Sequence, residues 1–176
     1  MSSRGQRASL ATTWAVLASM GLSGCALSAE ERITVQEEQL ASFIDRADAW
    51  GADIVAQIPE DEIELLSDVA GGSRGANGYE QWPRYYYFDQ IVVLHPNGPR
   101  SPTQVADDLE PWLEEQGWER STEGEFPPGE ESFERDYFRD GYHLALEIYT
   151  VEPPQAQSLQ IVIVTPTTDP GRSFDE

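Results

Sequence analysis

The sequence contains no lysine, only one cysteine and two histidines, and each scarcity removes a class of function. The single cysteine, Cys25, has no partner within the chain, which excludes an intramolecular disulfide framework. Histidine is the usual general base, but His95 and His143 both fall in predicted strands and no Gly-x-Ser-x-Gly elbow is present. No zinc-type His/Cys spacing and no EF-hand loop occurs either. The sequence therefore predicts a protein without a cofactor, a metal centre or a catalytic triad.

Positive charge is also scarce, because 11 arginines face 32 aspartates and glutamates and the net charge is −21. A phosphate backbone requires a basic surface, so nucleic-acid binding is excluded. Adhesion to anionic lipid through the protein surface is disfavoured for the same reason. A cationic partner would suit this charge, although repulsion that only keeps the protein soluble is the simpler interpretation. Weak calcium binding by an acidic loop is a further alternative, with four candidate ligands: Glu123, Glu125, Glu130 and Glu131.

The first residues have the composition of a secretory signal. Arg4 and Arg7 give a positively charged start without any acid, and the uncharged apolar run Leu10–Leu22 follows. That run is shorter than the roughly 20 residues that a membrane-spanning helix needs. Its length instead fits the core of a cleaved signal peptide.

The end of this run carries a recognisable motif. Leu22-Ser23-Gly24-Cys25 resembles the lipobox of bacterial lipoproteins, in which an aliphatic residue and two small residues precede the lipid-bearing cysteine. The resemblance implies cleavage before Cys25 and attachment of a diacylglyceryl group to its thiol. It follows that residues 1–24 are a lipoprotein signal peptide and 25–33 the lipidated cysteine with a short tether. The membrane is then a partner through this anchor on the extracytoplasmic face of the cell membrane.

The first predicted helix covers residues 34–58. Thr34 and Glu37 form a capping-box pattern, and apolar residues then recur at helical spacing up to Pro59. Gly51 lies on the apolar face, where a missing side chain would let another element approach. Residues 59–69 fit either a second short helix or a strand, and the four glycines within 71–78 predict a loop.

The rest of the chain predicts a second helix within a series of strands. Ser101, Pro102 and Gln104 begin a helix that Gly117 ends, and Asp140-Gly141 is a strong hairpin signal. This order predicts an α+β fold, a two-layer single domain over 34–166 with two main helices on one face of a mostly antiparallel sheet of about five strands. Residues 167–176 are expected to form a flexible C-terminal tail. The predicted strands are 84–95, 118–123, 133–139, 142–151 and 159–165.

This order of elements also resembles that of small uncharacterised lipoproteins of high-GC Gram-positive bacteria. The resemblance spans Trp82–Thr165 and rests on Gly117-Trp118 after a helix and on Asp140-Gly141-Tyr142 in a hairpin. These motifs are structural, so the resemblance implies no activity.

An aromatic stretch supplies the candidate binding surface, which consists of Trp82, Tyr85, Tyr86 and Tyr87. Alternate residues of a strand point to opposite faces, so either Tyr86 or the pair Tyr85 and Tyr87 must face away from the core unless both faces are covered. Exposed aromatic rings stack on sugars or anchor a protein partner. Packing of all four rings in the core is the alternative.

Together these patterns predict a lipid-anchored cell-envelope protein that is a non-enzymatic binding or assembly module for an envelope protein or a glycan. The alternative is a cell-envelope hydrolase that acts on glycan with paired carboxylates. Such an enzyme requires two acids roughly 5–10 Å apart that face each other across a cleft.

Overall fold

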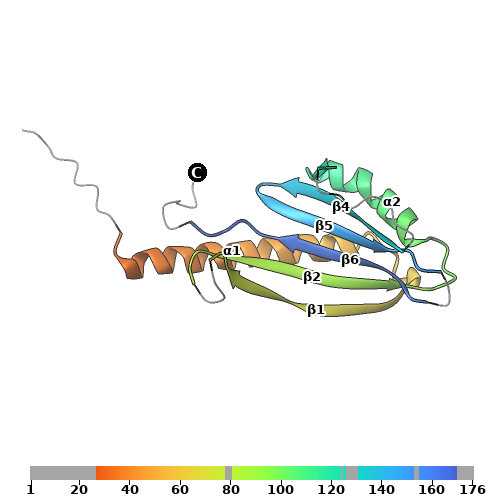
Figure 1. Ribbon diagram of the computed structural model, residues 1–176, viewed down its shortest axis with the longest axis horizontal. Helices are drawn as coiled ribbons and strands as arrows, with labels where there is room; N and C mark the ends of the chain where they lie inside the picture. Colours follow the sequence, from red (N-terminus) through yellow and green to blue (C-terminus); the bar gives the residue numbers. More distant parts are fainter. Residues whose placement is uncertain (1–26, 78–80, 124, 126–130, 153–154, 170–176) are drawn as a thin grey trace, which may run out of the picture.

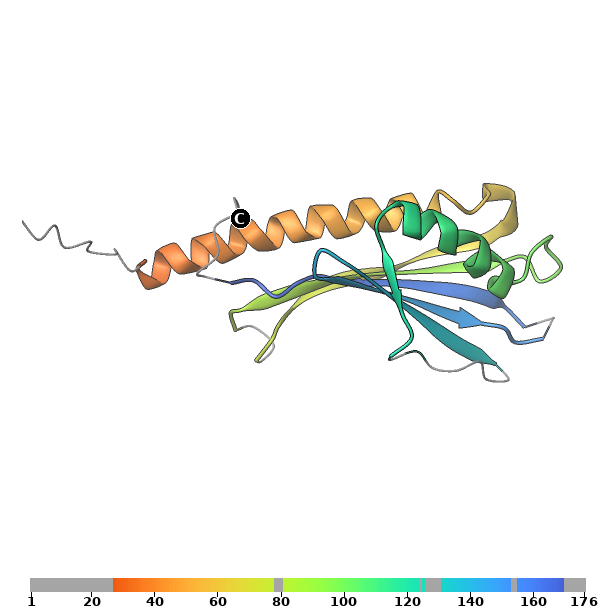
Figure 2. The ribbon, with the colours of Figure 1, turned by 90° about the horizontal axis from the view of Figure 1, so that it is seen from above.

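The computed structural model describes residues 27–77, 81–123, 125, 131–152 and 155–169. These residues form two layers, a six-stranded sheet and a pair of helices (Figure 1). Seen from above, both helices lie on the same side of the sheet (Figure 2). The predicted α+β architecture with two helices on one sheet face is therefore confirmed.

The sheet has one strand more than the approximate five expected, and its strands follow the order β1-β2-β6-β5-β4-β3. Every neighbouring pair among the described strands is antiparallel. As predicted from its apolar run, β2 is a central strand. The elements in chain order are α1 (Ala29–Val55), a 3-10 turn (Glu60–Glu62), β1 (Ile63–Gly75), β2 (Arg84–Leu94), α2 (Pro102–Glu115), β3 (Glu119–Ser121), β4 (Ser132–Arg139), β5 (Tyr142–Tyr149) and β6 (Gln157–Val164).

The additional strand is β1, which runs into the segment expected to be a glycine loop. The prediction of a loop at 71–78 is wrong as far as Gly75, because these residues pair with β2. A Cβ atom on Gly71 would lie only 2.7 Å from the carbonyl oxygen of Tyr87, and one on Gly72 would contact the Tyr87 ring. The glycines thus allow β1 to pack closely against the tyrosines, with a register shift between Val69 and Gly72.

Helix α1 begins earlier than its sequence pattern predicts. Ser28 is the N-cap, since its hydroxyl accepts from the amide of Glu31 and the Glu31 carboxylate accepts from the Ser28 amide. The predicted cap, Thr34, lies inside the helix and its hydroxyl donates to the carbonyl of Glu30. Residues 29–33, expected in the tether, are therefore helical, because the first of two capping boxes in the sequence starts the helix.

Helix α2 has the ends that its sequence predicts. Ser101 caps the first turn in a reciprocal pair with Gln104. At the other end Gly117 has φ 87°, and the amide of Trp118 donates to the carbonyl of Leu113 at 2.9 Å. This left-handed glycine and its 6→1 hydrogen bond form a Schellman motif, which turns the buried Trp118 back under the helix.

The β4–β5 hairpin turns through Asp140 and Gly141 as predicted. Both residues have positive φ, 51° and 81°, as a two-residue type I′ turn requires. This turn fixes the register, so that Glu134 lies directly opposite Glu147.

The core fills the space between the helices and one face of the sheet. Trp50 of α1 packs edge-on against Tyr142 of β5 at 4.9 Å and against Trp118 at 5.2 Å between ring centroids. Helix α1 passes close to the sheet at Gly51, where a Cβ atom would collide with the ring of Phe88. The fully enclosed apolar side chains of the strands are Val92, Leu144, Leu146, Ile148, Leu159, Ile161 and Ile163.

The described end of the chain is attached to α1 and β2. The hydroxyl of Thr168, which is buried, accepts from the amide of Arg84 at 2.9 Å and donates to Gln36. The amide of Asp169 donates to Gln39 at 2.8 Å. These contacts fall in the segment expected to be a flexible tail; residues 170–176 of that segment lie outside the described residues.

We predict that Gly51→Ala destabilises the fold. The new Cβ must displace the Phe88 ring, and such overpacking costs about 1–3 kcal/mol, more than alanine's helix preference returns. Thermal denaturation measures the effect. As a matched control, Ala52→Gly at the exposed neighbouring position should cost no more than about 1 kcal/mol. A Gly51→Ala protein that melts above the natural sequence would contradict the close approach.

Candidate functional site

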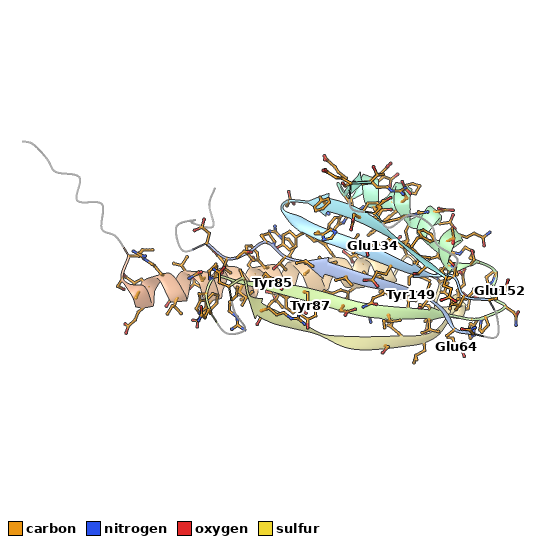
Figure 3. All side chains as sticks on the ribbon, viewed as in Figure 1. Glu64, Tyr85, Tyr87, Glu134, Tyr149 and Glu152 are labelled. Atoms are coloured by element: carbon orange, nitrogen blue, oxygen red, sulfur yellow. The ribbon has the colours of Figure 1, made fainter. Side chains whose placement is uncertain are left out.

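The side of the sheet turned away from α1 and α2, here called the open face, is covered by no described helix (Figures 1 and 2). Figure 3 looks onto this face and shows Tyr85, Tyr87, Glu134 and Tyr149 on it. Because side chains alternate along each strand, the cross-strand register determines which residues lie here. On the inner strands these are Tyr85, Tyr87, Asp89, Ile91, Val93, Ser158, Gln160, Val162 and Val164, and on β5 and β4 they are His143, Ala145, Glu147, Tyr149, Ser132, Glu134, Asp136 and Phe138.

The predicted aromatic surface is divided by the sheet. Tyr85 and Tyr87 lie on the open face, each partly exposed. Tyr86 lies on the helix side, where its hydroxyl donates to Asp48 of α1 at 2.8 Å. Burial, reinforced by this hydrogen bond, raises the pKa of Tyr86 to about 12. Trp82 precedes β2, and the guanidinium of Arg84 lies 5.7 Å from its ring centroid.

A group of carboxylates lies on the open face beside the tyrosines. Glu134 of β4 is opposite Glu147 of β5, which is in turn opposite Gln160 of β6. Directly opposed residues have Cβ atoms about 4.5–5.5 Å apart. The amide of Gln160 donates to Asp89 of β2 at 2.8 Å, which extends the polar group across four strands.

The remaining carboxylate of this group contacts a histidine. Nε2 of His143 lies 2.5 Å from Oδ1 of Asp136, and the imidazole stacks on the ring of Phe138 with 4.7 Å between centroids and 11° between planes. The aspartate is buried, whereas the histidine is partly exposed. His143 alternates with the buried apolar residues of β5 and therefore lies on the open face, where it pairs with Asp136.

The electrostatics of the group disfavour negative charge on Glu134. Its partial burial, followed by the nearby charges of Asp136 and Glu147, raises the pKa of the Glu134 carboxyl above its ordinary value. The hydroxyl of Tyr149 donates to Glu147 at 2.7 Å, and this bond with burial raises the tyrosine pKa to about 12. Two of the carboxylates therefore repel each other at close range, and a cation placed between them would relieve that repulsion.

The same end of the open face is slightly hollowed. A depression of about 260 Å³ is lined by Ser132, Phe133, Glu134, Glu147 and Tyr149. A second one, of about 440 Å³, lies between the end of α2 and the β4–β5 turn and is lined mainly by backbone and polar side chains of 116–119 and 138–141. Neither is the deep apolar pocket typical of a small-molecule site.

The carboxylate pair was not among the candidates predicted from the sequence. The signal was present, because Glu134 and Glu147 are equally distant from the Asp140-Gly141 turn and a two-residue hairpin must oppose such residues. The predicted aromatic stretch, by contrast, contributes only Tyr85 and Tyr87 to this face. Cys25, the predicted lipidation site, lies outside the described residues.

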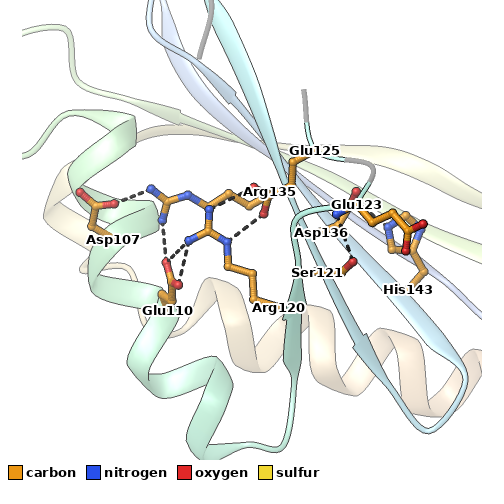
Figure 4. A network of polar contacts seen from close by, with 9 residues as sticks. All are labelled: Asp107, Glu110, Arg120, Ser121, Glu123, Glu125, Arg135, Asp136 and His143. Atoms are coloured by element: carbon orange, nitrogen blue, oxygen red, sulfur yellow. Dashed lines mark hydrogen bonds and ion pairs between the residues drawn. The ribbon is translucent and has the colours of Figure 1, made fainter. Parts of the chain in front are cut away.

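At the edge of the sheet beside α2, three acids bind two arginines, as Figure 4 shows. Arg120 of β3 binds Glu110 of α2 and Glu125, each at 2.8 Å. Arg135 of β4 binds the same Glu110 at 3.2 Å and Asp107 of α2 at 2.5 Å. Arg120, the nearest cation, also lowers the pKa of Glu125. This network ties α2 to the edge of the sheet, and we assign it a structural role.

The acidic-loop alternative for calcium finds no support in this part of the chain. Glu125 is held by Arg120, and Glu130 lies outside the described residues. Within the described ranges no group of three or more His, Cys, Asp or Glu side chains is arranged to hold a metal ion.

Comparison with family models, curated proteins and solved structures gives no match to this chain. Among the described helices, none has both the length and the apolar character needed to cross a bilayer. The class of the protein is thus defined by its fold, a two-layer α+β domain with one uncovered sheet face.

We predict that Glu134→Gln stabilises the protein at neutral pH. The folded state raises the Glu134 pKa, so the natural protein loses stability as the pH rises through that value, and the glutamine variant does not. The gain should stay within about 1 kcal/mol, because the group is partly exposed, and should vanish below the ordinary carboxyl pKa. Melting temperatures at neutral and acidic pH measure it. Glu38→Gln, on an exposed turn of α1, is the control and should show a smaller dependence on pH.

Proposed function

We propose that the mature chain is a lipid-anchored, extracytoplasmic, non-enzymatic binding module whose open face meets an envelope protein or a glycan. The observation that carries the proposal is the uncovered sheet face, which presents tyrosines and carboxylates on a rigid six-stranded scaffold. A sheet that buries one face against helices and leaves the other with large aromatic residues has a surface suited to recognition.

The geometry of the open face suits recognition of an extended surface. Tyr85 and Tyr87 are two residues apart on one strand and therefore point the same way about 7 Å from each other. Tyrosine gives a large, rigid contact area with a polar tip, which is why it is enriched where proteins bind partners. Phe138, 46% exposed on the neighbouring half of the face, adds a third ring.

The anchor rests on the resemblance of Leu22-Ser23-Gly24-Cys25 to a lipobox. Only Ala26–Ser28 separates Cys25 from α1, so a lipid on this cysteine would adjoin a helix rather than a long tether. The first part of α1 extends beyond the sheet (Figure 2). In such an arrangement the helix holds the domain away from the membrane, with the open face along the side of the molecule.

The hydrolase alternative is favoured by one observation, the opposed Glu134 and Glu147 with a raised pKa on Glu134. A general acid requires such a shift. Against it, the two carboxylates lie side by side on a sheet face above a depression of about 260 Å³, and no described wall stands opposite them. A glycosidase needs its two acids on either side of the scissile bond, which this surface does not provide.

We predict that Cys25→Ala releases the protein from the membrane or leaves it unprocessed. Without the thiol no diacylglyceryl group can be attached, and two acyl chains are what make such anchoring stable. Fractionation of expressing cells with detection of the protein in membrane and soluble fractions measures this. Ser23→Ala, which keeps a small residue at that position, is the control and should remain anchored. Normal anchoring of Cys25→Ala would refute the lipoprotein assignment.

We predict that the double variant Tyr85→Ala/Tyr87→Ala loses envelope partners captured by crosslinking in cells. Both rings lie on the open face. If they anchor the partner, their removal should reduce the amount of crosslinked partner at least tenfold. Mass spectrometry of crosslinked products from the lipidated protein is the measurement. Glu114→Ala/Glu115→Ala on the exposed end of α2 is the control and should retain capture.

Two outcomes would contradict the binding proposal. Equal capture by both double variants would place the partner away from the open face. Cleavage of cell-wall glycan fragments by the natural protein, abolished in Glu134→Gln, would instead favour the hydrolase.

A further inference from the structure

The open face carries negative charge that the described arginines do not balance. Within the described residues Asp89, Glu134 and Glu147 form no ion pair, and Asp136 pairs only with His143. The arginines in ion pairs are engaged elsewhere, at the ends and on the helix side of the sheet: Arg100, Arg120, Arg135 and Arg139. These ion-paired arginines thus lie away from the open face, on which the Arg74 guanidinium contacts Tyr87.

The spacing of these acids indicates how long a ligand must be to neutralise all of them. Neighbouring strands are about 4.8 Å apart, so Glu134 on β4 and Asp89 on β2, three strand steps and two residues away, are separated by roughly 16 Å. Glu134 and Asp136 are about 7 Å apart along one strand. No single metal ion bridges such distances, whereas successive basic side chains of one peptide do.

Arg74 shows how a guanidinium lies on this face. Its Cζ is 4.8 Å from the centroid of the Tyr87 ring, and Nη2 donates to the Tyr87 hydroxyl at 3.3 Å. A cation above an aromatic face is stabilised by the ring quadrupole, and a planar guanidinium also stacks on it. The rings of Tyr85 and Tyr149 offer further surfaces of this kind beside the carboxylates.

Apolar side chains separate the charged positions. Ile91 lies beside Gln160 and Val162 lies between Ala145 and Asp89 in the cross-strand rows. A ligand that follows this surface must therefore present basic and apolar groups in turn, as an amphipathic peptide segment does.

We propose that the occupant of the open face is a basic, amphipathic segment of a partner protein, with arginine side chains at Asp89, Glu134 and Glu147. This inference rests on the proposed function, since it identifies the partner class of the same surface. The partner's apolar residues contact Ile91, Val93 and Val162, and its guanidinium groups stack on the rings of Tyr85 and Tyr149.

The test uses the full-length protein in detergent and a fluorescein-labelled peptide that repeats Arg-Arg-Val-Val, so that either side of the extended peptide presents arginine and valine in turn. Fluorescence anisotropy is the readout. The double variant Glu134→Gln/Glu147→Gln should raise the Kd about tenfold, the loss expected for two partly exposed charge pairs. Glu114→Gln/Glu115→Gln removes the same charge from α2 and should change the Kd less than about twofold. Added salt should weaken binding to the natural protein.

Several results would overturn this inference. An equal loss of affinity in both double variants would reduce the binding to general attraction by an acidic protein. No binding of the peptide to the natural protein would exclude the basic segment outright. Binding of spermine that depends on Glu134 and Glu147, without binding of the peptide, would assign the face to a small polycation.

The failure of this inference can be told apart from failure of the proposed function. If Tyr85→Ala/Tyr87→Ala abolishes crosslinking in cells while the arginine peptide fails to bind, the open face is a binding surface for another class of partner. If neither depends on the open face, both proposals fall.

Discussion

Burial of one face of the six-stranded sheet under α1 and α2 is the constraint on which the rest of the structure depends. Side chains alternate along a strand, so the apolar residues that fill this layer determine which residues face away. Phe88 and Val92 point to the helices, and Tyr87, Asp89 and Ile91 consequently point outward. The absence of a side chain at Gly51 lets α1 lie close enough for this packing. The open face is therefore a consequence of the core rather than an independent feature.

The same layer explains the uneven distribution of charge. With no lysine in the chain, arginines supply the positive side-chain charge, and Arg120 and Arg135 are required beneath α2 to neutralise Glu110 and Asp107. Arg135 is 8% exposed, and leaving a buried cation unpaired would be costly. Because these arginines are held on the helix side, acids on the opposite side have few internal partners.

Local patterns in the sequence sufficed for the fold class, the ends of α2 and the β4–β5 hairpin, because capping boxes, a left-handed glycine and an Asp-Gly turn are local signals. They failed for β1, because glycines such as those at 71–75 are typical of a loop. Here the glycines at 71 and 72 instead make room for the side chains of Tyr86 and Tyr87. Strand alternation required that Tyr86 lie on the opposite face of β2 from Tyr85 and Tyr87. Which of these faces is turned to the helices depends on long-range packing, in which Tyr86 contacts Asp48 of α1. The register of the β4–β5 hairpin, which local sequence specifies, places Glu134 opposite Glu147. The residues of β2 that lie near this pair depend on the β2–β6 pairing, a long-range contact that no local pattern specifies.

The position of α1 also bears on how an acidic binding face would work beside a membrane. Anionic headgroups repel carboxylates, so an acidic surface turned toward the bilayer would be pushed away from it. Helix α1 spans 27 residues, roughly 40 Å, and its N-terminal part projects past the sheet on the side of the chain that leads to Cys25. A lipid on that cysteine would therefore leave the sheet standing out from the surface with its open face directed sideways. In that orientation the charge that would oppose adhesion to lipid is the same charge that would attract the proposed basic segment, and such a partner would reach the face without displacing the domain from the membrane.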